Sequence, residues 1–69
     1  MQISARNTLK GKVKRIHMGE LDAEVTIELP GGIEVVAVVT TRSCERLGLS
    51  VGGEAYAIIK ASSVMVAVD

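Results

Sequence analysis

The chain has 69 residues, a net charge of zero and a single cysteine, Cys44, so we expect one small domain without an internal disulfide. A domain of this length buries only roughly 60% of the surface that its unfolded chain exposes. Because 48% of the residues are hydrophobic and no histidine–cysteine zinc cluster is present, we expect stability to come from oligomerisation. The sequence lacks an apolar run of signal-peptide or membrane-helix length, which predicts a cytoplasmic protein that does not contact membranes.

The charges cancel overall but are unevenly spread along the chain. Residues 1–19 carry five lysines and arginines and no acid, whereas residues 20–69 carry three basic residues against eight acidic ones. This asymmetry favours an anionic partner at the basic end, or complementary contacts between subunits. A solvated strand with lysines on its open face explains the same pattern.

The first predicted strand covers Gly11–Met18 and follows an extended N-terminal segment. Its apolar residues Val13 and Ile16 fall on opposite phases of a period-2 pattern, which indicates a bulge near Lys14-Arg15. Gly19-Glu20 is expected to form the turn into the next strand.

The next two strands are predicted to form a hairpin. Apolar and polar residues alternate along Ala23–Leu29, and Pro30-Gly31-Gly32 then provides a tight turn. Glu34–Thr40 follows as a strand rich in β-branched residues and apolar on both faces. A strand without a wet face is covered on both sides, so we expect its second face to be buried by the fold or by another subunit.

A short helix is predicted over Thr41–Leu49. Thr41 can supply the N-cap oxygen and Gly48 suits the left-handed position that ends a helix. Cys44 lies inside this helix next to Leu47, a predicted core residue, which favours a buried, inert thiol.

The C-terminal part is predicted to contain a turn at Val51-Gly52-Gly53 and two strands, Glu54–Lys60 and Ser63–Val68, joined tightly through Ala61-Ser62. The complete order is three strands, one short helix and two strands. This order is typical of an all-β, OB-fold-like Greek-key barrel of five strands with the helix between strands 3 and 4. An SH3-like barrel is the main alternative.

The composition argues against two common functions of such barrels. Single-stranded nucleic acids are bound by stacking bases on aromatic side chains, and the chain has no Phe, no Trp and only Tyr56. A binding partner of this type is therefore disfavoured. No catalytic motif is present either, and His17 in a basic strand is interpreted as an exposed or interface histidine, so we expect a protein that is not an enzyme.

Short polar side chains and cations occur at three places in the sequence. They are Ser4, Arg6 and Asn7 near the N-terminus, Thr40 and Ser43 where the third strand meets the helix, and Lys60 with Ala61 and Ser62 after the fourth strand. A tetrahedral dianion is bound by hydroxyl and N–H donors together with one or two positive charges. Each of these groups also has a structural explanation, as a turn cap, a helix cap or a solvated strand end.

Three motifs in order resemble those of the molbindins, also called Mop domains, of the TOBE-like molybdate-binding proteins. They are Ile3-Ser4-Ala5-Arg6-Asn7 with Leu9-Lys10-Gly11, then Val38–Ser43 with Leu47-Gly48-Leu49 and Gly52, and finally Ile59–Val66. The resemblance covers essentially the whole chain. It implies a single Mop domain over residues 1–69 with an OB-like fold. It also implies that molybdate or tungstate is bound as an oxyanion, with no protein-ligated metal ion.

The resemblance further implies where the oxyanion binds. Ser4, Arg6, Thr40, Ser43 and Lys60 match the family's ligands, with the Ala61 backbone and Ser62 beside Lys60. Asn7 belongs to the motif and is expected to orient the segment. The site is expected to lie between subunits of a homohexamer built as a trimer of dimers.

In this family a stand-alone domain of this size is a store that maintains cellular molybdate, and that function is our expectation for this chain. An anion-sensing module that reports to a partner protein is the alternative. Further anion sites near the Met18-Gly19-Glu20 turn occur in relatives, and Glu20 places a negative charge there.

Overall fold

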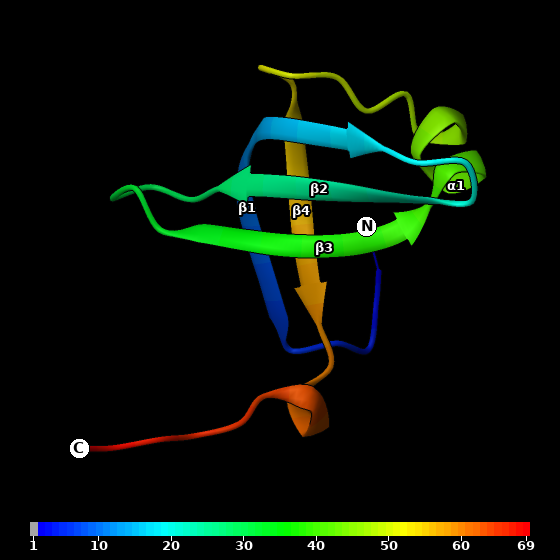
Figure 1. Ribbon diagram of the computed structural model, residues 1–69. Coiled ribbons are helices and arrows are strands. Elements are labelled where there is room, and N and C mark those ends of the chain that lie inside the picture. The colour runs from blue at the N-terminus through cyan, green and yellow to red at the C-terminus, as the bar shows by residue number, and fades with distance from the viewer. Residues whose placement is uncertain (1) are drawn as a thin grey trace.

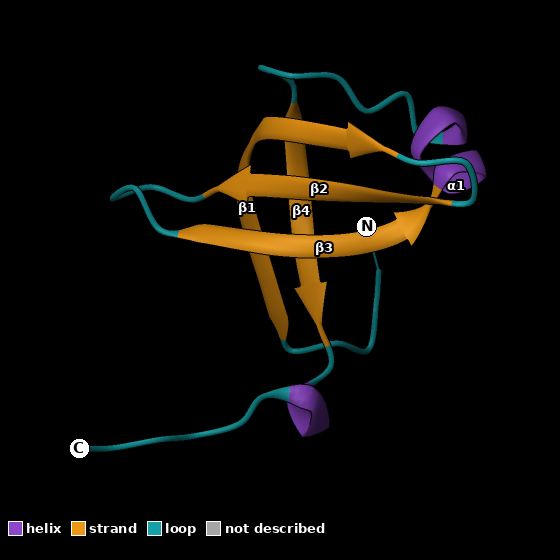
Figure 2. Ribbon diagram, in the orientation of Figure 1, coloured by secondary structure: helices purple, strands orange, loops and turns teal. Residues whose placement is uncertain are grey.

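The computed structural model describes residues 2–69, and its main feature is one curled antiparallel sheet with a short helix at one end (Figures 1 and 2). In chain order the elements are β1 (Asn7–Met18), β2 (Asp22–Glu28), β3 (Glu34–Thr40), α1 (Thr41–Arg46), β4 (Glu54–Ile59) and a 3₁₀ turn (Ala61–Ser63). The four strands lie in the order β3-β2-β1-β4. The sheet is therefore a half-barrel with β3 and β4 at its two edges. None of the helices in residues 2–69 is long and apolar enough to cross a membrane.

Strand β1 is long because it belongs to two ladders. Its first half pairs with β4, from Asn7 opposite Ile59 to Lys12 opposite Glu54. Its second half pairs with β2, with a register shift between Val13 and Arg15. The predicted bulge is confirmed, and it bends β1 so that β4 crosses behind β2 and β3 in Figure 1. The strand begins at Asn7, earlier than the expected Gly11, because pairing with β4 organises these residues.

The predicted hairpin between β2 and β3 is confirmed. The two strands pair in continuous register from Asp22 opposite Thr40 to Glu28 opposite Glu34. Gly31 and Gly32 take φ values of 91° and 86°, a region that L side chains rarely adopt, so the two glycines form the turn.

The core is small and lies on the concave side of the sheet. Its fully buried apolar members are Val13, Ala23, Val25, Ile27, Cys44 and Ala57. The alternation of β2 places Ala23, Val25 and Ile27 on this side, as its sequence pattern predicts. Cys44 is buried as expected, but the expectation for Leu47 is wrong, since this side chain is 62% exposed. The helix ends at Arg46, and Leu47 therefore extends past the core.

The helix is shorter than expected, and its N-cap is the neighbouring threonine. Thr40 Oγ1 accepts a hydrogen bond from the Ser43 N–H at 3.0 Å, whereas Thr41 Oγ1 donates to the Gly19 carbonyl at 2.8 Å. The prediction of Thr41 as the N-cap is wrong, because its hydroxyl hydrogen-bonds to Gly19 of the β1–β2 turn instead of to the helix. Gly48 follows the last helical turn with φ of 65°, as predicted.

The predicted fifth strand does not form within one chain. After β4, the 3₁₀ turn is closed by hydrogen bonds from Ser63 N–H to the Lys60 carbonyl and from Val64 N–H to the Ala61 carbonyl. The expected strand Ser63–Val68 instead runs away from the sheet, and Figure 1 shows it as the red tail. The five-stranded barrel is thus wrong for the isolated chain, which forms four strands because this turn directs residues 64–69 away from both edges.

Gly11 provides a test of how closely β1 approaches β2 at this position. A Cβ atom at this position would lie 2.5 Å from the Glu28 carbonyl oxygen and 2.8 Å from Ile27 Cγ2. We expect G11A to lower the free energy of unfolding by about 1–3 kcal/mol, because backbone must move to make room. T8A, at an exposed position of the same strand, is the control and should change it by less than about 0.5 kcal/mol. Urea denaturation at matched protein concentration measures both, and equal effects would contradict the close approach.

Candidate anion-binding site

A pocket of about 570 Å³ lies where the β1–β4 ladder ends. Its lining consists of Ile3, Ser4, Ala5, Arg6, Ile58, Lys60, Ala61 and Ser62. The pairing of Asn7 with Ile59 creates this pocket, because it places the segment before β1 beside the segment after β4. Five of the eight candidate residues thus lie around one cavity, although Ser4 and Arg6 are separated from Lys60, Ala61 and Ser62 by more than fifty positions in the sequence.

Asn7 links the two sides of the pocket. Its Nδ2 atom donates a hydrogen bond to the Ile59 carbonyl at 3.3 Å, and the side chain is half-buried. This bond uses the amide within the chain and holds Arg6 and Lys60 at the same end of the ladder.

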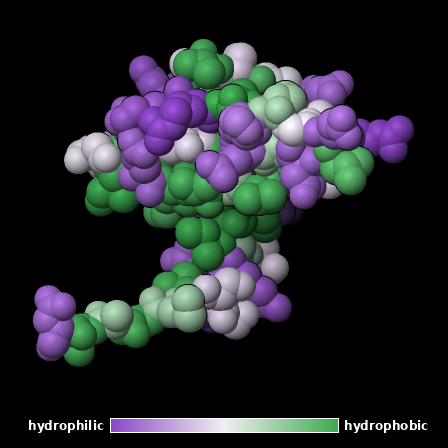
Figure 3. Space-filling view, viewed as in Figure 1, coloured by the Kyte–Doolittle hydropathy of each residue, from purple (hydrophilic) through white to green (hydrophobic). Residues whose placement is uncertain are grey.

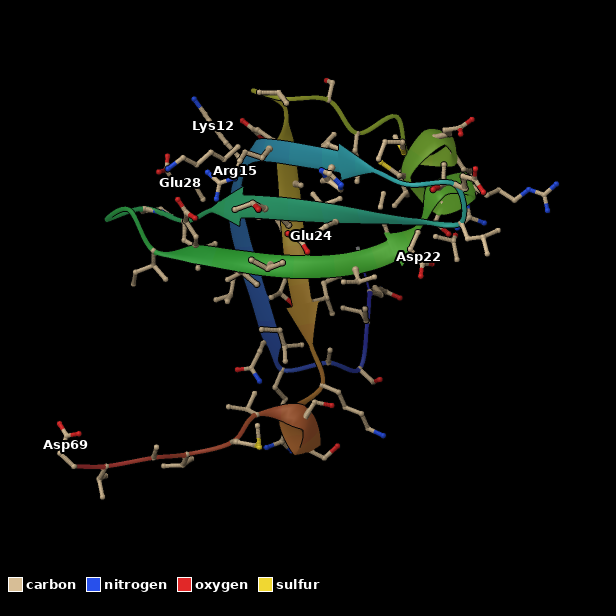
Figure 4. All side chains as sticks on the ribbon, viewed as in Figure 1. Lys12, Arg15, Asp22, Glu24, Glu28 and Asp69 are labelled. Atoms are coloured by element: carbon tan, nitrogen blue, oxygen red, sulfur yellow. The ribbon has the colours of Figure 1, made fainter. Side chains whose placement is uncertain are left out.

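Most cations of the basic N-terminal region are paired with acids of the same chain. Lys14 lies 2.6 Å from Glu34 and 3.4 Å from Glu28, and Arg15 lies 2.9 Å from Glu34. Lys10 pairs with Glu54 at 3.3 Å. Figure 4 shows Arg15 and Glu28 at the same end of the sheet. The charge asymmetry of the sequence is therefore largely neutralised, because β1 pairs with β2 and β4 and its Lys14 and Arg15 side chains reach Glu34 of β3.

Arg6 and Lys60 differ from these cations. Within the part of the chain that the structure describes, neither side chain forms an ion pair, and both are exposed. They face the same pocket together with the hydroxyl-bearing residues Ser4 and Ser62. Two unpaired positive charges and short hydroxyl side chains form a donor set suited to a small anion.

The remaining candidates, Thr40 and Ser43, lie elsewhere. Thr40 Oγ1 donates to Ser43 Oγ at 2.8 Å at the start of α1, and Thr40 lines a separate surface with Glu20 and Asp22. Asp22 is also the residue that pairs with Thr40 across β2 and β3, near the end of β1 that is remote from Asn7. One chain therefore holds the candidate residues as two separate groups.

The β1–β2 turn holds Gly19 by hydrogen bonds on both sides of the residue. The Gly19 N–H donates to the Asp22 carbonyl at 2.9 Å, and the Gly19 carbonyl accepts from Thr41. Glu20 is exposed beside them. The Gly19 N–H of this turn is thus already used within the chain.

Two kinds of residue were missed by sequence reasoning. Ile3, which the sequence analysis names only as part of the N-terminal motif, and Ile58 form apolar walls of the pocket, and the only signal for Ile58 is its alternation within β4. The acids Glu28 and Glu34 form ion pairs with Lys14 and Arg15, which only the strand register reveals.

Comparison with known proteins identifies the class first. The TOBE domain profile matches residues 3–66. The chain is 52% identical over 69 residues to the probable molybdenum-pterin-binding protein of Haemophilus influenzae, with all of both chains covered. It therefore belongs to the TOBE-domain family and, within it, to the molybdenum-pterin-binding Mop proteins (molbindins), which are binding proteins and not enzymes.

Solved structures show the same fold. MopII from Clostridium pasteurianum has a TM-score of 0.92 and 40% identity, with 97% of this chain and 100% of that chain covered. The cytoplasmic molybdate-binding protein ModG, crystallised with molybdate bound, has a TM-score of 0.91 and 48% identity, with 94% and 46% covered.

The Lys14–Glu34 pair predicts an acid-sensitive contribution to stability. Hydrogen bonds from Lys14 and then Arg15 lower the pKa of Glu34 below its ordinary value of 4.5. The stabilisation is therefore present above pH 4.5 and is lost as the pH falls through the lowered pKa of the folded state. We expect E34Q to be less stable than wild type at neutral pH, with the difference shrinking below pH 4.5. Urea denaturation across this range checks it. E20Q should show no such convergence, and a pH-independent gap for E34Q would contradict the assignment.

Proposed function

We propose that residues 1–69 act as one Mop domain that binds molybdate or tungstate and stores it in the cytoplasm. The observation that carries this proposal is the pocket in which Arg6 and Lys60 converge without acidic partners in the described chain. The membership in the Mop family and the molybdate bound to ModG support the choice of anion.

The ligands in this proposal come from two chains. Ser4, Arg6, Lys60, Ala61 and Ser62 supply one half of the site, and Asn7 positions it by its bond to Ile59. The hydroxyls of Thr40 and Ser43 from a second copy supply the other half. The separation of the two groups within one chain supports this division. A homo-oligomer, which we propose to be a hexamer built as a trimer of dimers, brings the halves together.

The two cations give the sharpest test of the site. We expect R6A and K60A each to weaken molybdate binding by about 1.5–3 kcal/mol, because each removes a charged hydrogen-bond donor from a dianion. Lys12, an exposed cation of β1 outside the pocket, provides the matched control K12A, which should bind as wild type does. Isothermal titration measures all three variants. Wild-type affinity in both R6A and K60A would place the site elsewhere.

The same titration tests the choice of anion. Molybdate and tungstate should bind more tightly than sulfate and phosphate. Equal affinity for all four anions would contradict a molybdate-binding function while leaving the pocket as a general anion site.

Native mass spectrometry with added molybdate tests the division of the site between chains. Since one chain holds only part of the ligand set, anions should be found on oligomers and not on monomers. Anion-bound monomers would show that a single chain suffices. The same spectra report the number of subunits and the number of anions per assembly.

A further inference from the structure

The anion pocket is polar on one part of its surface and apolar on the rest. Arg6, Lys60 and two serines supply its positive charges and hydroxyl groups. The other lining residues are apolar, and they are Ile3, Ala5, Ile58 and Ala61. The side chains of half the residues around the pocket therefore cannot form a hydrogen bond with an anion.

Two isoleucines are the large members of this apolar part. Ile3 is 49% exposed and Ile58 is 41% exposed, so each side chain presents apolar surface in the pocket that it lines. Ile3 precedes β1, and Ile58 lies in β4 next to Ile59, the residue that pairs with Asn7. The ladder that brings Arg6 beside Lys60 thus also brings the two isoleucines to the same pocket.

Ile58 connects the pocket to a larger apolar surface. It also lines a groove of about 810 Å³ between β3 and β4, together with Val36, Val38 and Tyr56. Figure 3 shows apolar side chains gathered along the lower side of the sheet, toward the C-terminal tail. An anion in the pocket would therefore lie against apolar surface as well as against its two cations.

An apolar wall discriminates between anions of equal charge by their hydration. Moving an ion out of water costs less as the ion grows, because the Born hydration energy falls with increasing radius. Sulfate, selenate and molybdate are tetrahedral dianions of increasing size, and all of them are fully ionised at neutral pH. Beside Ile3 and Ile58, sulfate would lose the most hydration energy and molybdate the least.

The two cations act in the opposite direction. Coulomb attraction grows as the charges approach each other, so Arg6 and Lys60 by themselves favour the smaller dianion. A preference for the larger anion therefore requires a group that penalises the stronger hydration of the smaller one. The isoleucine side chains are groups of this kind in the pocket.

We propose that Ile3 and Ile58 are specificity-determining residues of the anion site, which select large, weakly hydrated dianions over sulfate. The inference rests on the proposed function and adds the means by which the site distinguishes anions of the same charge and shape. It assigns binding strength to the cations and hydroxyls, and the choice between anions to the apolar wall.

Substitution of Ile3 by valine or threonine separates the polarity of the wall from its shape. Valine and threonine have nearly the same shape, but only threonine carries a hydroxyl that holds water or an anion. Because Ile3 is half-exposed and precedes β1, both variants should fold, which circular dichroism verifies. I3V should keep the wild-type ratio of the sulfate to the molybdate dissociation constant within about 2-fold, whereas I3T should lower it by about 10-fold.

Isothermal titration with molybdate, selenate and sulfate measures these ratios, and displacement of bound molybdate measures the anions that bind weakly. Selenate should fall between the other two anions in wild type, and the spread of all three should narrow in I3T. I58V and I58T repeat the comparison on the other wall. I33T is the control, since Ile33 is 63% exposed and lies outside the pocket, and it should keep the wild-type ratio.

Two results would overturn the proposal. One is an equal ratio in the valine and threonine variants at both positions, which would make the polarity of the wall irrelevant. The other is an equal loss of affinity for all three anions, which would indicate a structural role. Both results leave the proposed function intact while wild type prefers molybdate. Wild-type protein without that preference would contradict the proposed function itself, and this inference with it.

Discussion

The pairing of Asn7 with Ile59 is the contact on which the other functional features depend. It begins the ladder between β1 and β4 and brings Arg6 and Lys60 to one pocket. Two cations facing one pocket repel each other, so the ladder and the Asn7 side chain hold them against that repulsion. In the function that we propose, an anion placed between them relieves this repulsion. The proposed function therefore links anion binding to folding stability, because a ligand that binds only the folded state stabilises that state.

The parts of the fold that were predicted correctly have local causes. The change of phase between Val13 and Ile16 indicated the bulge, because a period-2 pattern records which face each residue occupies. Gly31-Gly32 and Gly48 marked backbone with positive φ, and the structure uses them in this way. In each case a few neighbouring residues contain the whole signal, so no knowledge of distant contacts is required.

The parts that were not predicted depend on partners distant in sequence. From the sequence alone, Thr40 and Thr41 are equivalent as N-cap residues. The structure distinguishes them, because the Thr41 hydroxyl donates a hydrogen bond to the Gly19 carbonyl and Thr40 caps the helix. The ion pairs of Lys14 with Glu28 and Glu34 exist only in the observed register. For the candidate site, the sequence identified Arg6 and Lys60, which share a pocket, but could not show that Thr40 and Ser43 lie apart from them. The residues 64–69 have strand character, but an extended segment needs an edge to pair with.

Tyr56 has a consequence for how this protein can be observed. It is the single aromatic residue among 69, since the chain contains neither Phe nor Trp, and it lies half-exposed in the wall of the groove between β3 and β4. Near-ultraviolet absorption and intrinsic fluorescence therefore come from one known position. The optical signal of the unlabelled protein reports whether this groove is open to water or covered, without contributions from any other side chain.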